Sequence, residues 1–359
     1  MDKSTYYAGD GSDGSDESES HSSSDDEGCR PTTESAANES VFFDLTKSIY
    51  RLYACEDHSD ANCTADFRLM DRLSNSTHEK VVQRMVSLGI VELFQHVWLR
   101  HFDDQFSTKP LSNRSVESKP SRLWDNLFFV LNTVVNLTDA SVSACQRVLD
   151  VDLHKTILKF LSCLALNSNK ETKFTYEQFM TADCLMTVLY NVIQVLPEAR
   201  MLYREEKALD VLQRFRTNTN FSISCVALIL QAYVINEEEF QILCSNEETF
   251  LFLVTMLDGA LATMDHRSSY GYKATELAVA VNKLAVNDKN QAKIINSGVV
   301  ESYVGMLGVG NSNEEQLVAV QGLWTLSFIS VEFVRKQVGC TEGLFTIEFL
   351  FMLSVVHIT

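Results

Sequence analysis

The sequence predicts an all-α fold, a solenoid of about six three-helix repeats that winds as a right-handed superhelix. One apolar pattern occurs twice, with Leu284-Ala285 followed about 42 residues later by Leu326-Ser327, which is the period of a helical repeat. Hydrophobic residues make up 45% of the 359-residue chain, with only four prolines and no alternating Val/Ile/Thr-rich run. Because such repeats bury their apolar faces only by stacking, they leave a long concave surface.

Residues 1–40 are predicted to form a disordered acidic tail. They are rich in Ser, Asp, Glu and Gly, and hold eleven acids against Lys3 and Arg30. Such a composition buries too little apolar surface to offset the entropy of ordering. Candidate phosphorylation sites are Ser22, Ser23 and Ser24, since each is followed by an acid three residues later. The alternative is an unmodified tail that keeps the chain in solution.

Residues 41–78 are predicted to cap the stack. Between Val41 and Tyr53 the apolar residues share one helical face, and residues 54–65 are polar and irregular. Cys55, His58 and Cys63 lie close together in that segment. Zinc sites need about four ligands, with a short Cys-x₂₋₄-Cys pair, so we expect no metal site here.

Residues 79–343 are predicted to hold the repeats. The first has helices over 81–88 and 90–98, joined by Gly89, and a third helix over 123–137 after an inserted loop at 102–121. Later third helices are expected to end near 194, 234, 285 and 327. The apolar residues 344–359 would form a helix of a truncated last repeat, leaving an open end that would allow self-association.

Composition excludes several classes of function. The net charge is −18 without a basic stretch, which argues against binding to nucleic acid or to an anionic membrane surface. The apolar C-terminal stretch is too short to span a membrane. Nine scattered cysteines and an acidic start without a secretory signal indicate reduced thiols in a cytoplasmic protein.

Two motifs carry a resemblance to armadillo-repeat proteins. Ile294-Ile295-Asn296-Ser297-Gly298-Val299-Val300, followed by Met306-Leu307, is similar to the core of that repeat, and Gly322-Leu323-Trp324-Thr325-Leu326-Ser327 to the end of its third helix. Residues 134–139, 275–290 and 314–328 resemble the armadillo half of invertebrate armadillo–TIR signalling adaptors. That resemblance implies an adaptor in innate-immune or cell-death signalling, with a TIR domain that would follow Thr359.

Candidate groove residues lie on the third helices. In nuclear-import armadillo proteins, which this chain resembles only in part, a Trp and an Asn four residues later hold an extended basic peptide. Here Asn132 and Asn136 have that spacing without the Trp, so import cargo is not expected. Trp324 fits either core packing or a groove contact. The full candidate set is Trp124, Asn132, Asn136, Asn282, Gln321 and Trp324.

No nucleotide-binding, hydrolase or metalloprotease motif occurs, so we expect neither an enzyme nor a cofactor. The predicted function is binding of a protein partner along the concave face, as an adaptor or regulatory module. Two alternatives remain open. One is a nucleotide-sensing module that restrains a TIR effector, which would need a basic pocket between repeats. The other is a catenin-like structural scaffold, which would need a continuous basic groove.

Overall fold

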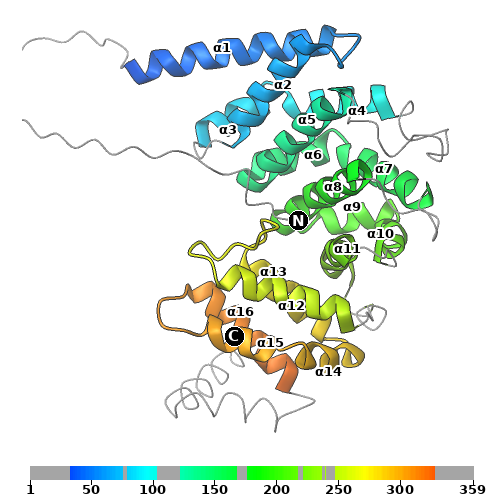
Figure 1. The fold of residues 1–359 in the computed structure, drawn as a ribbon, viewed down its shortest axis with the longest axis vertical. Coiled ribbons are helices and arrows are strands. Elements are labelled where there is room, and N and C mark those ends of the chain that lie inside the picture. Colours follow the sequence, from blue (N-terminus) through cyan, green and yellow to red (C-terminus); the bar gives the residue numbers. More distant parts are fainter. Residues whose placement is uncertain are drawn as a thin grey trace, which may run out of the picture.

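The protein is a single stack of helices (Figure 1). The structure, a computed structural model, describes residues 33–75, 79–102, 122–167, 176–216, 221–236, 239 and 247–327. These residues form sixteen α-helices, and the only β-type pairing among them is an isolated bridge between Arg267 and Lys273. None of these helices is long and apolar enough to cross a membrane.

Most of the helices fall into triplets that follow the chain. Four triplets are complete, and the fourth unit is described only by its last two helices, α12 and α13. In chain order they are α3 (Glu79–Ser87), α4 (Ile90–Phe102), α5 (Arg122–Ala140); α6 (Val142–Asp150), α7 (Leu153–Asn167), α8 (Tyr176–Val195); α9 (Ala199–Glu205), α10 (Ala208–Arg216), α11 (Phe221–Val234); α12 (Glu247–Leu261), α13 (Ala274–Ala285); and α14 (Asp288–Asn296), α15 (Val299–Met306), α16 (Asn313–Ser327).

Corresponding helices of successive units pack on one another. The third helices form a continuous layer in which α5 packs on α8, α8 on α11, α11 on α13 and α13 on α16. The second helices do the same where α4 packs on α7 and α7 on α10. One apolar core therefore runs from Leu45 to Leu326, as expected for units that bury their faces by stacking. The third helices end within a few residues of the predicted positions.

A glycine turns the chain between the first and second helices of two units. Gly89 and Gly298 have φ of +84° and +88°, a left-handed conformation that costs glycine nothing and a residue with a Cβ about 1–2 kcal/mol. Each precedes a buried Ile or Val that starts the second helix. The repeated Gly-Ile-Val-Glu and Gly-Val-Val-Glu sequences thus mark the same turn in two repeats.

The N-terminal end differs from the prediction. The first helix, α1 (Thr33–Ala54), begins at Thr33 rather than Val41, in a Ser/Ala/Glu segment of good helix propensity. A second helix, α2 (Ala61–Ser74), starts where an irregular segment was expected, with Asp60 as its N-cap. Because α1 packs on α4 and α2 on α5, the pair takes the places of the second and third helices of a preceding unit.

Several predictions fall outside the described residues. These are the phosphorylation sites Ser22, Ser23 and Ser24 with most of the acidic tail, and the sixth unit with the apolar segment 344–359 and the self-association assigned to it.

Candidate functional site

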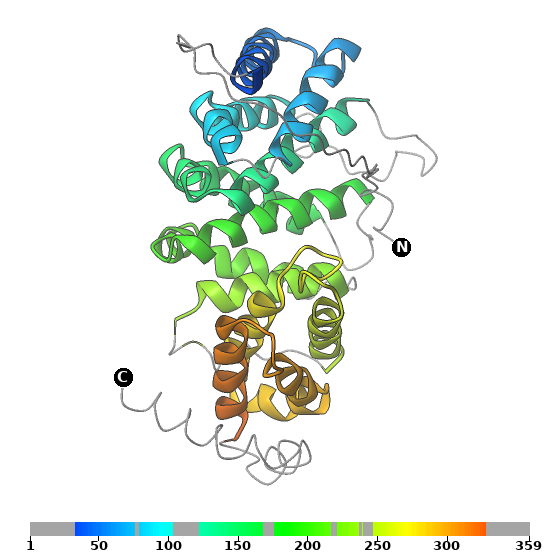
Figure 2. The ribbon, with the colours of Figure 1, turned by 90° about the vertical axis from the view of Figure 1, so that its left-hand side faces the viewer.

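Four half-buried residues of α5, two of which pack against the edge of the core, form the first candidate surface. Phe128, Asn132, Val135 and Asn136 are all half-buried and follow the i, i+4, i+7, i+8 spacing of one helical face. We call these four residues the α5 face. α5 packs between α2 and α8 in the layer of third helices (Figure 2). The α5 face therefore has a neighbouring helix on each side.

The two asparagines of the α5 face point toward α2. The Asn132 side-chain amide donates to Asp71 Oδ1 at 2.5 Å, and the Asn136 amide donates to Ser74 Oγ at 3.0 Å and Asn75 Oδ1 at 3.1 Å. Burial raises the pKa of Asp71, and the bond from Asn132 opposes that shift. Both amides use their N–H groups within the solenoid, while among the described residues neither Oδ1 accepts a hydrogen bond.

Asn282 holds three helices of the C-terminal units together. Its Nδ2 donates to the Val318 carbonyl on α16 at 2.9 Å, and its Oδ1 accepts the Tyr303 hydroxyl of α15 at 2.5 Å. An ideal Cβ on Gly322 would lie 2.4 Å from both Asn282 Oδ1 and the Tyr303 ring, so α16 approaches closely only because this residue is glycine. Both polar atoms of Asn282 therefore serve packing between repeats.

The remaining candidates are distributed over two ends of the stack. Trp124 is half-buried against the core at the start of α5, and Trp324 is half-buried near the end of α16. Gln321 is exposed one turn before Trp324, and Leu317, a further turn back, is 47% exposed. The structure thus groups Asn132 and Asn136 at one end and Asn282, Gln321 and Trp324 at the other, with Trp124 near the first group.

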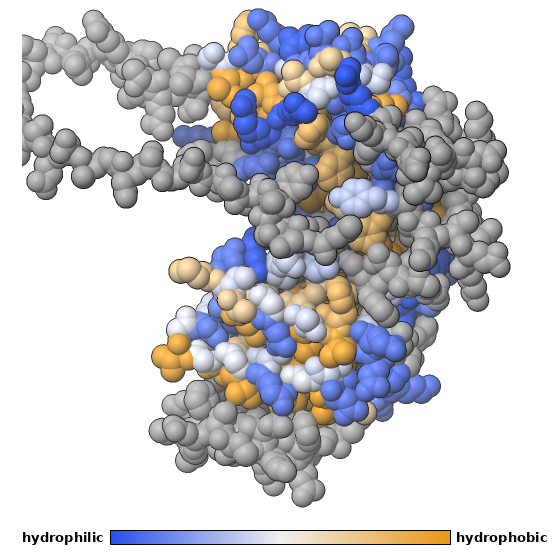
Figure 3. Space-filling view, in the orientation of Figure 1, coloured by the Kyte–Doolittle hydropathy of each residue, from blue (hydrophilic) through white to orange (hydrophobic). Residues whose placement is uncertain are grey.

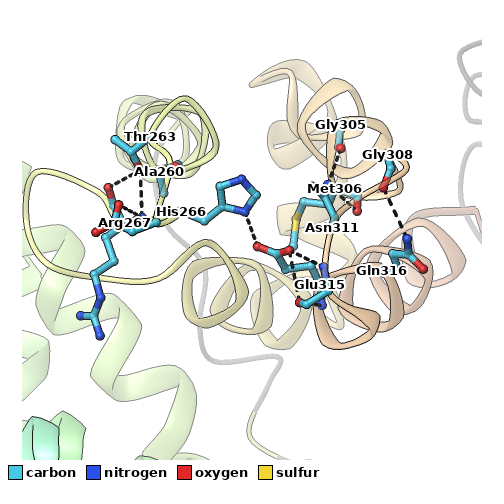
Figure 4. A network of polar contacts seen from close by, with 12 residues as sticks. Ala260, Thr263, His266, Arg267, Gly305, Met306, Gly308, Asn311, Glu315 and Gln316 are labelled. Carbon is cyan, nitrogen blue, oxygen red and sulfur yellow. Dashed lines mark hydrogen bonds and ion pairs between the residues drawn. The ribbon is translucent and has the colours of Figure 1, made fainter. Parts of the chain in front are cut away.

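Between these ends, the loop joining α12 to α13 (residues 262–273) crosses the third-helix side (Figure 2). Its own hydrogen bonds make it compact, with Ser268 N bonded to Tyr272 O and Ala274 N to His266 O, both at 2.8 Å. The imidazole of His266 lies 2.5 Å from Glu315 on α16 (Figure 4). Burial raises the pKa of Glu315, but bonds from His266 and Ser312 outweigh it, so the net pKa is lowered.

The same loop reaches back over α11 to α8. Tyr272 is buried, and its ring meets that of Tyr190 edge-on at 5.3 Å, while Tyr233 of α11 meets Tyr190 from another side at 5.3 Å. Burial raises the pKa of Tyr233 to about 12. On α11 and just beyond it, all residues from 223 to 235 are buried except Tyr233, which is half-buried. Tyr272 and Tyr233 therefore cover Tyr190 at this position of the predicted concave surface.

The arginines around the third unit are engaged in contacts within the solenoid. Arg200 Nε donates to the Tyr233 carbonyl at 3.2 Å, and Arg204 pairs with Glu239 through both of its terminal nitrogens. Glu239 also accepts the Asn236 backbone N–H at 2.9 Å. Hydrogen bonds from Arg204 and Asn236 lower the pKa of Glu239 to about 2.

The loop between α1 and α2 gathers several of the polar residues singled out in the sequence. The Sγ atoms of Cys55 and Cys63 are 3.0 Å apart, whereas His58 turns away from them. His58 Nε2 lies 2.9 Å from the Leu52 carbonyl and Nδ1 lies 2.7 Å from His101 Nε2. Burial lowers the pKa of His58. No group of three or more metal-ligating side chains forms among the described residues.

The triplets, the glycine turns and the layer of third helices define an armadillo-type α-solenoid. No family model matches the chain, and no curated protein matches it. Among solved structures, the match to an engineered protein from a structural genomics consortium covers 79% of this chain and 97% of the engineered protein, at 15% identity and a TM-score of 0.43. The match to a designed armadillo-repeat protein in complex with the peptide (KR)4 covers 79% of this chain and 99% of the designed protein, at 15% identity and a TM-score of 0.42.

The sequence predicts a loop over residues 265–271, where the structure has the α12–α13 loop, but it did not predict the contacts of that loop or the cysteine contact. The course of the loop across α11 depends on Tyr272, whose partner Tyr190 is distant in sequence. A signal was available in α11 itself, because a helix with no polar face must be covered on all sides.

Proposed function

We propose that this protein is a protein-interaction solenoid that binds an extended polypeptide segment on the α5 face. The observation that supports this most directly is the pairing of apolar and amide side chains there. Phe128 and Val135 offer partly exposed apolar surface, and Asn132 and Asn136 carry Oδ1 atoms that accept no hydrogen bond within the described residues. An extended segment brings backbone N–H groups that such acceptors bind.

The amide geometry makes the α5 face preorganised for this role. Asn132 and Asn136 lie one helical turn apart, and bonds to α2 hold both side chains in place. A partner that bonds to their oxygens therefore fixes little additional side-chain motion, which lowers the entropic cost of binding. On its C-terminal side this surface meets the α12–α13 loop, where Arg267 lies 3.8 Å from Asp139 of α5 and Tyr272 covers Tyr190 of α8.

A selected peptide tests this proposal. Random peptides displayed on phage are selected against the purified protein, and one binder is titrated by fluorescence anisotropy. Val135→Lys places a charge on the α5 face and should weaken binding at least roughly tenfold, because a desolvated, unpaired charge costs more than about 1.4 kcal/mol. Val142→Lys is the matched control, since Val142 is 58% exposed on α6, the first helix of its unit, and lies outside the α5 face.

Two results would count against the proposal. Selected peptides could bind Val135→Lys as tightly as the wild type, or lose equal affinity to Val142→Lys. In either case the α5 face is not where extended segments bind.

A finer role, as an adaptor or regulatory module in TIR-type innate-immune signalling, has the sequence resemblance as its support. The transcript beyond the codon for Thr359 tests it. An in-frame segment encoding a TIR domain supports the role, and a stop codon or an unrelated domain removes it.

One cavity favours the nucleotide-sensing alternative. An open space of about 500 Å³ between α1 and α3 is lined by Phe42, Phe43, Thr46, Lys80 and Arg84, which combine two aromatic side chains with two cations, and Lys47 lies 4.1 Å from the Phe43 ring centroid. Bases stack on aromatic rings and phosphates bind Lys and Arg. Calorimetric titration with adenine nucleotides tests this, with Lys80→Ala as the variant that should lose any heat of binding.

A further inference from the structure

We propose that Cys55 and Cys63 form a reversible disulfide, which makes the α1–α2 turn a site of oxidative modification by low-molecular-weight disulfides such as oxidised glutathione. Their Sγ atoms already lie 3.0 Å apart. An S–S bond is about 2.05 Å long, so the two sulfurs must approach by roughly 1 Å. A change of that size is within reach of side-chain rotation and a small shift of one turn.

The local fold holds the two cysteines in this position independently of their own contact. Cys55 directly follows α1, and Cys63 lies in the first turn of α2. Both thiols face the Asp57 carbonyl oxygen, at 3.1 Å from Cys55 Sγ and 3.9 Å from Cys63 Sγ. The turn between them is closed by the Asp60 N–H bond to the Asp57 carbonyl at 3.2 Å.

The rest of the solenoid anchors this turn. Arg100 of α4 donates to the Cys55 carbonyl at 2.9 Å, and Asn126 of α5 donates to the His58 carbonyl at 2.7 Å. Because two other helices hold the backbone at Cys55 and at His58, in the turn that joins the two cysteines, this turn is fixed to the rest of the solenoid. A preorganised thiol pair reacts within the molecule at a high effective concentration.

The two thiols differ in their surroundings, and this sets the order of the reaction. Cys55 is half-buried and meets solvent, whereas Cys63 is 6% exposed and its pKa is raised to about 12, mainly by burial. Cys55 therefore reacts first. Its thiolate, formed by loss of a proton to water, attacks one sulfur of the small disulfide and expels one thiolate, which takes up a proton.

The second step closes the ring. Cys63 loses its proton, attacks the Cys55 sulfur of the mixed disulfide and expels the second small thiol. In sum, two cysteine thiols give up two electrons and two protons, and one small disulfide becomes two thiols. The product links the end of α1 to the start of α2 and so fastens the two-helix cap.

Alkylation mapping of the full-length protein tests the proposal. The protein is equilibrated in glutathione buffers of increasing oxidised fraction, trapped with N-ethylmaleimide in denaturant, digested and analysed by mass spectrometry. We expect loss of two alkylation sites, a peptide pair linked through Cys55 and Cys63, and recovery of both thiols with dithiothreitol. Cys145 and Cys225, which are fully buried, serve as internal controls and should stay alkylated.

Two variants separate the steps. Cys63→Ala should stop the reaction at the mixed disulfide, with glutathione on Cys55, and Cys55→Ala should leave Cys63 as a free thiol. If Cys63→Ala does not fold, the linked peptide of the wild type decides alone. The proposal is overturned if both cysteines remain alkylated in oxidised buffer, if wild-type Cys55 stays glutathionylated, or if either sulfur pairs with a different cysteine.

Discussion

Among the described glycines, Gly322 is the one where an added methyl group would meet the closest neighbouring atoms, so Gly322→Ala should destabilise the stack. In α16, an ideal Cβ at this residue would lie 2.4 Å from Asn282 Oδ1 and from the Tyr303 ring. Tyr303 is fully buried, and its hydroxyl is bonded to that same Oδ1, so neither neighbour has room to move away. We therefore expect Gly322→Ala to force α16 away from α13 and α15.

The expected size follows from three contributions. Replacing glycine by alanine inside a helix stabilises it by about 1 kcal/mol. Overpacking a buried site costs about 1–3 kcal/mol, and weakening the Tyr303–Asn282 hydrogen bond costs about 1 kcal/mol more. The net change is a loss of roughly 1–3 kcal/mol in the free energy of unfolding.

Gly259 provides the matched control. It is exposed in α12, and a Cβ there would meet nothing within 4 Å, so Gly259→Ala should gain up to about 1 kcal/mol. Urea unfolding followed by tryptophan fluorescence gives both values, and hydrogen exchange should show faster opening of α13, α15 and α16 in Gly322→Ala. If Gly322→Ala matched or exceeded the wild type in stability while Gly259→Ala gained, the close approach of α16 would be wrong.

Three further predictions concern stability. Leu284→Asp should lower it by several kcal/mol, since Leu284 is 1% exposed and an unpaired charge would be buried; an unchanged melting temperature would contradict the assigned register. Glu239→Gln should flatten the pH dependence: the carboxylate, with its pKa lowered to about 2, stabilises fully above about pH 4.5 and loses this effect as pH falls toward 2. Because the ion pair with Arg204 is partly exposed, the free energies of unfolding of the wild type and Glu239→Gln should differ by less than about 1 kcal/mol. If the two free energies fall in parallel as the pH is lowered, the ion pair does not contribute to stability. Asp66→Ala should cost about 1–3 kcal/mol in thermal unfolding, because the buried Ser48 hydroxyl, 2.7 Å from Asp66, loses its acceptor; an unaltered transition would show that it finds another.

Local signals explain which parts of the fold could be predicted. Gly298 and the apolar residues after it mark a turn and a helix start within a few residues of one another, so the repeat register was readable. α2 was missed because its apolar residues, Cys63, Phe67 and Met70, are separated by Asp and Arg residues that lower its mean hydropathy. Its assignment depends on packing against α5, a contact across about 60 residues that no local pattern carries.

For the candidate surface, too, the sequence predicted the local features and not the contacts between helices. Spacing alone placed Asn132 and Asn136 on one face of a helix. It did not show that their N–H groups bond to α2, nor that Asn282 has both polar atoms engaged. An asparagine with the same neighbours in sequence can serve a ligand or a neighbouring repeat, and only the position of the next helix distinguishes the two.

The α12–α13 loop changes how this stack should melt. In a simple solenoid each unit contacts only the next, so the array can open from its ends one unit at a time. Here the loop passes over the third unit, with Tyr272 on Tyr190 of the second and His266 on Glu315 of the fifth. Opening the middle of the array must therefore break contacts on both sides at once, and we expect these units to unfold in a single cooperative transition.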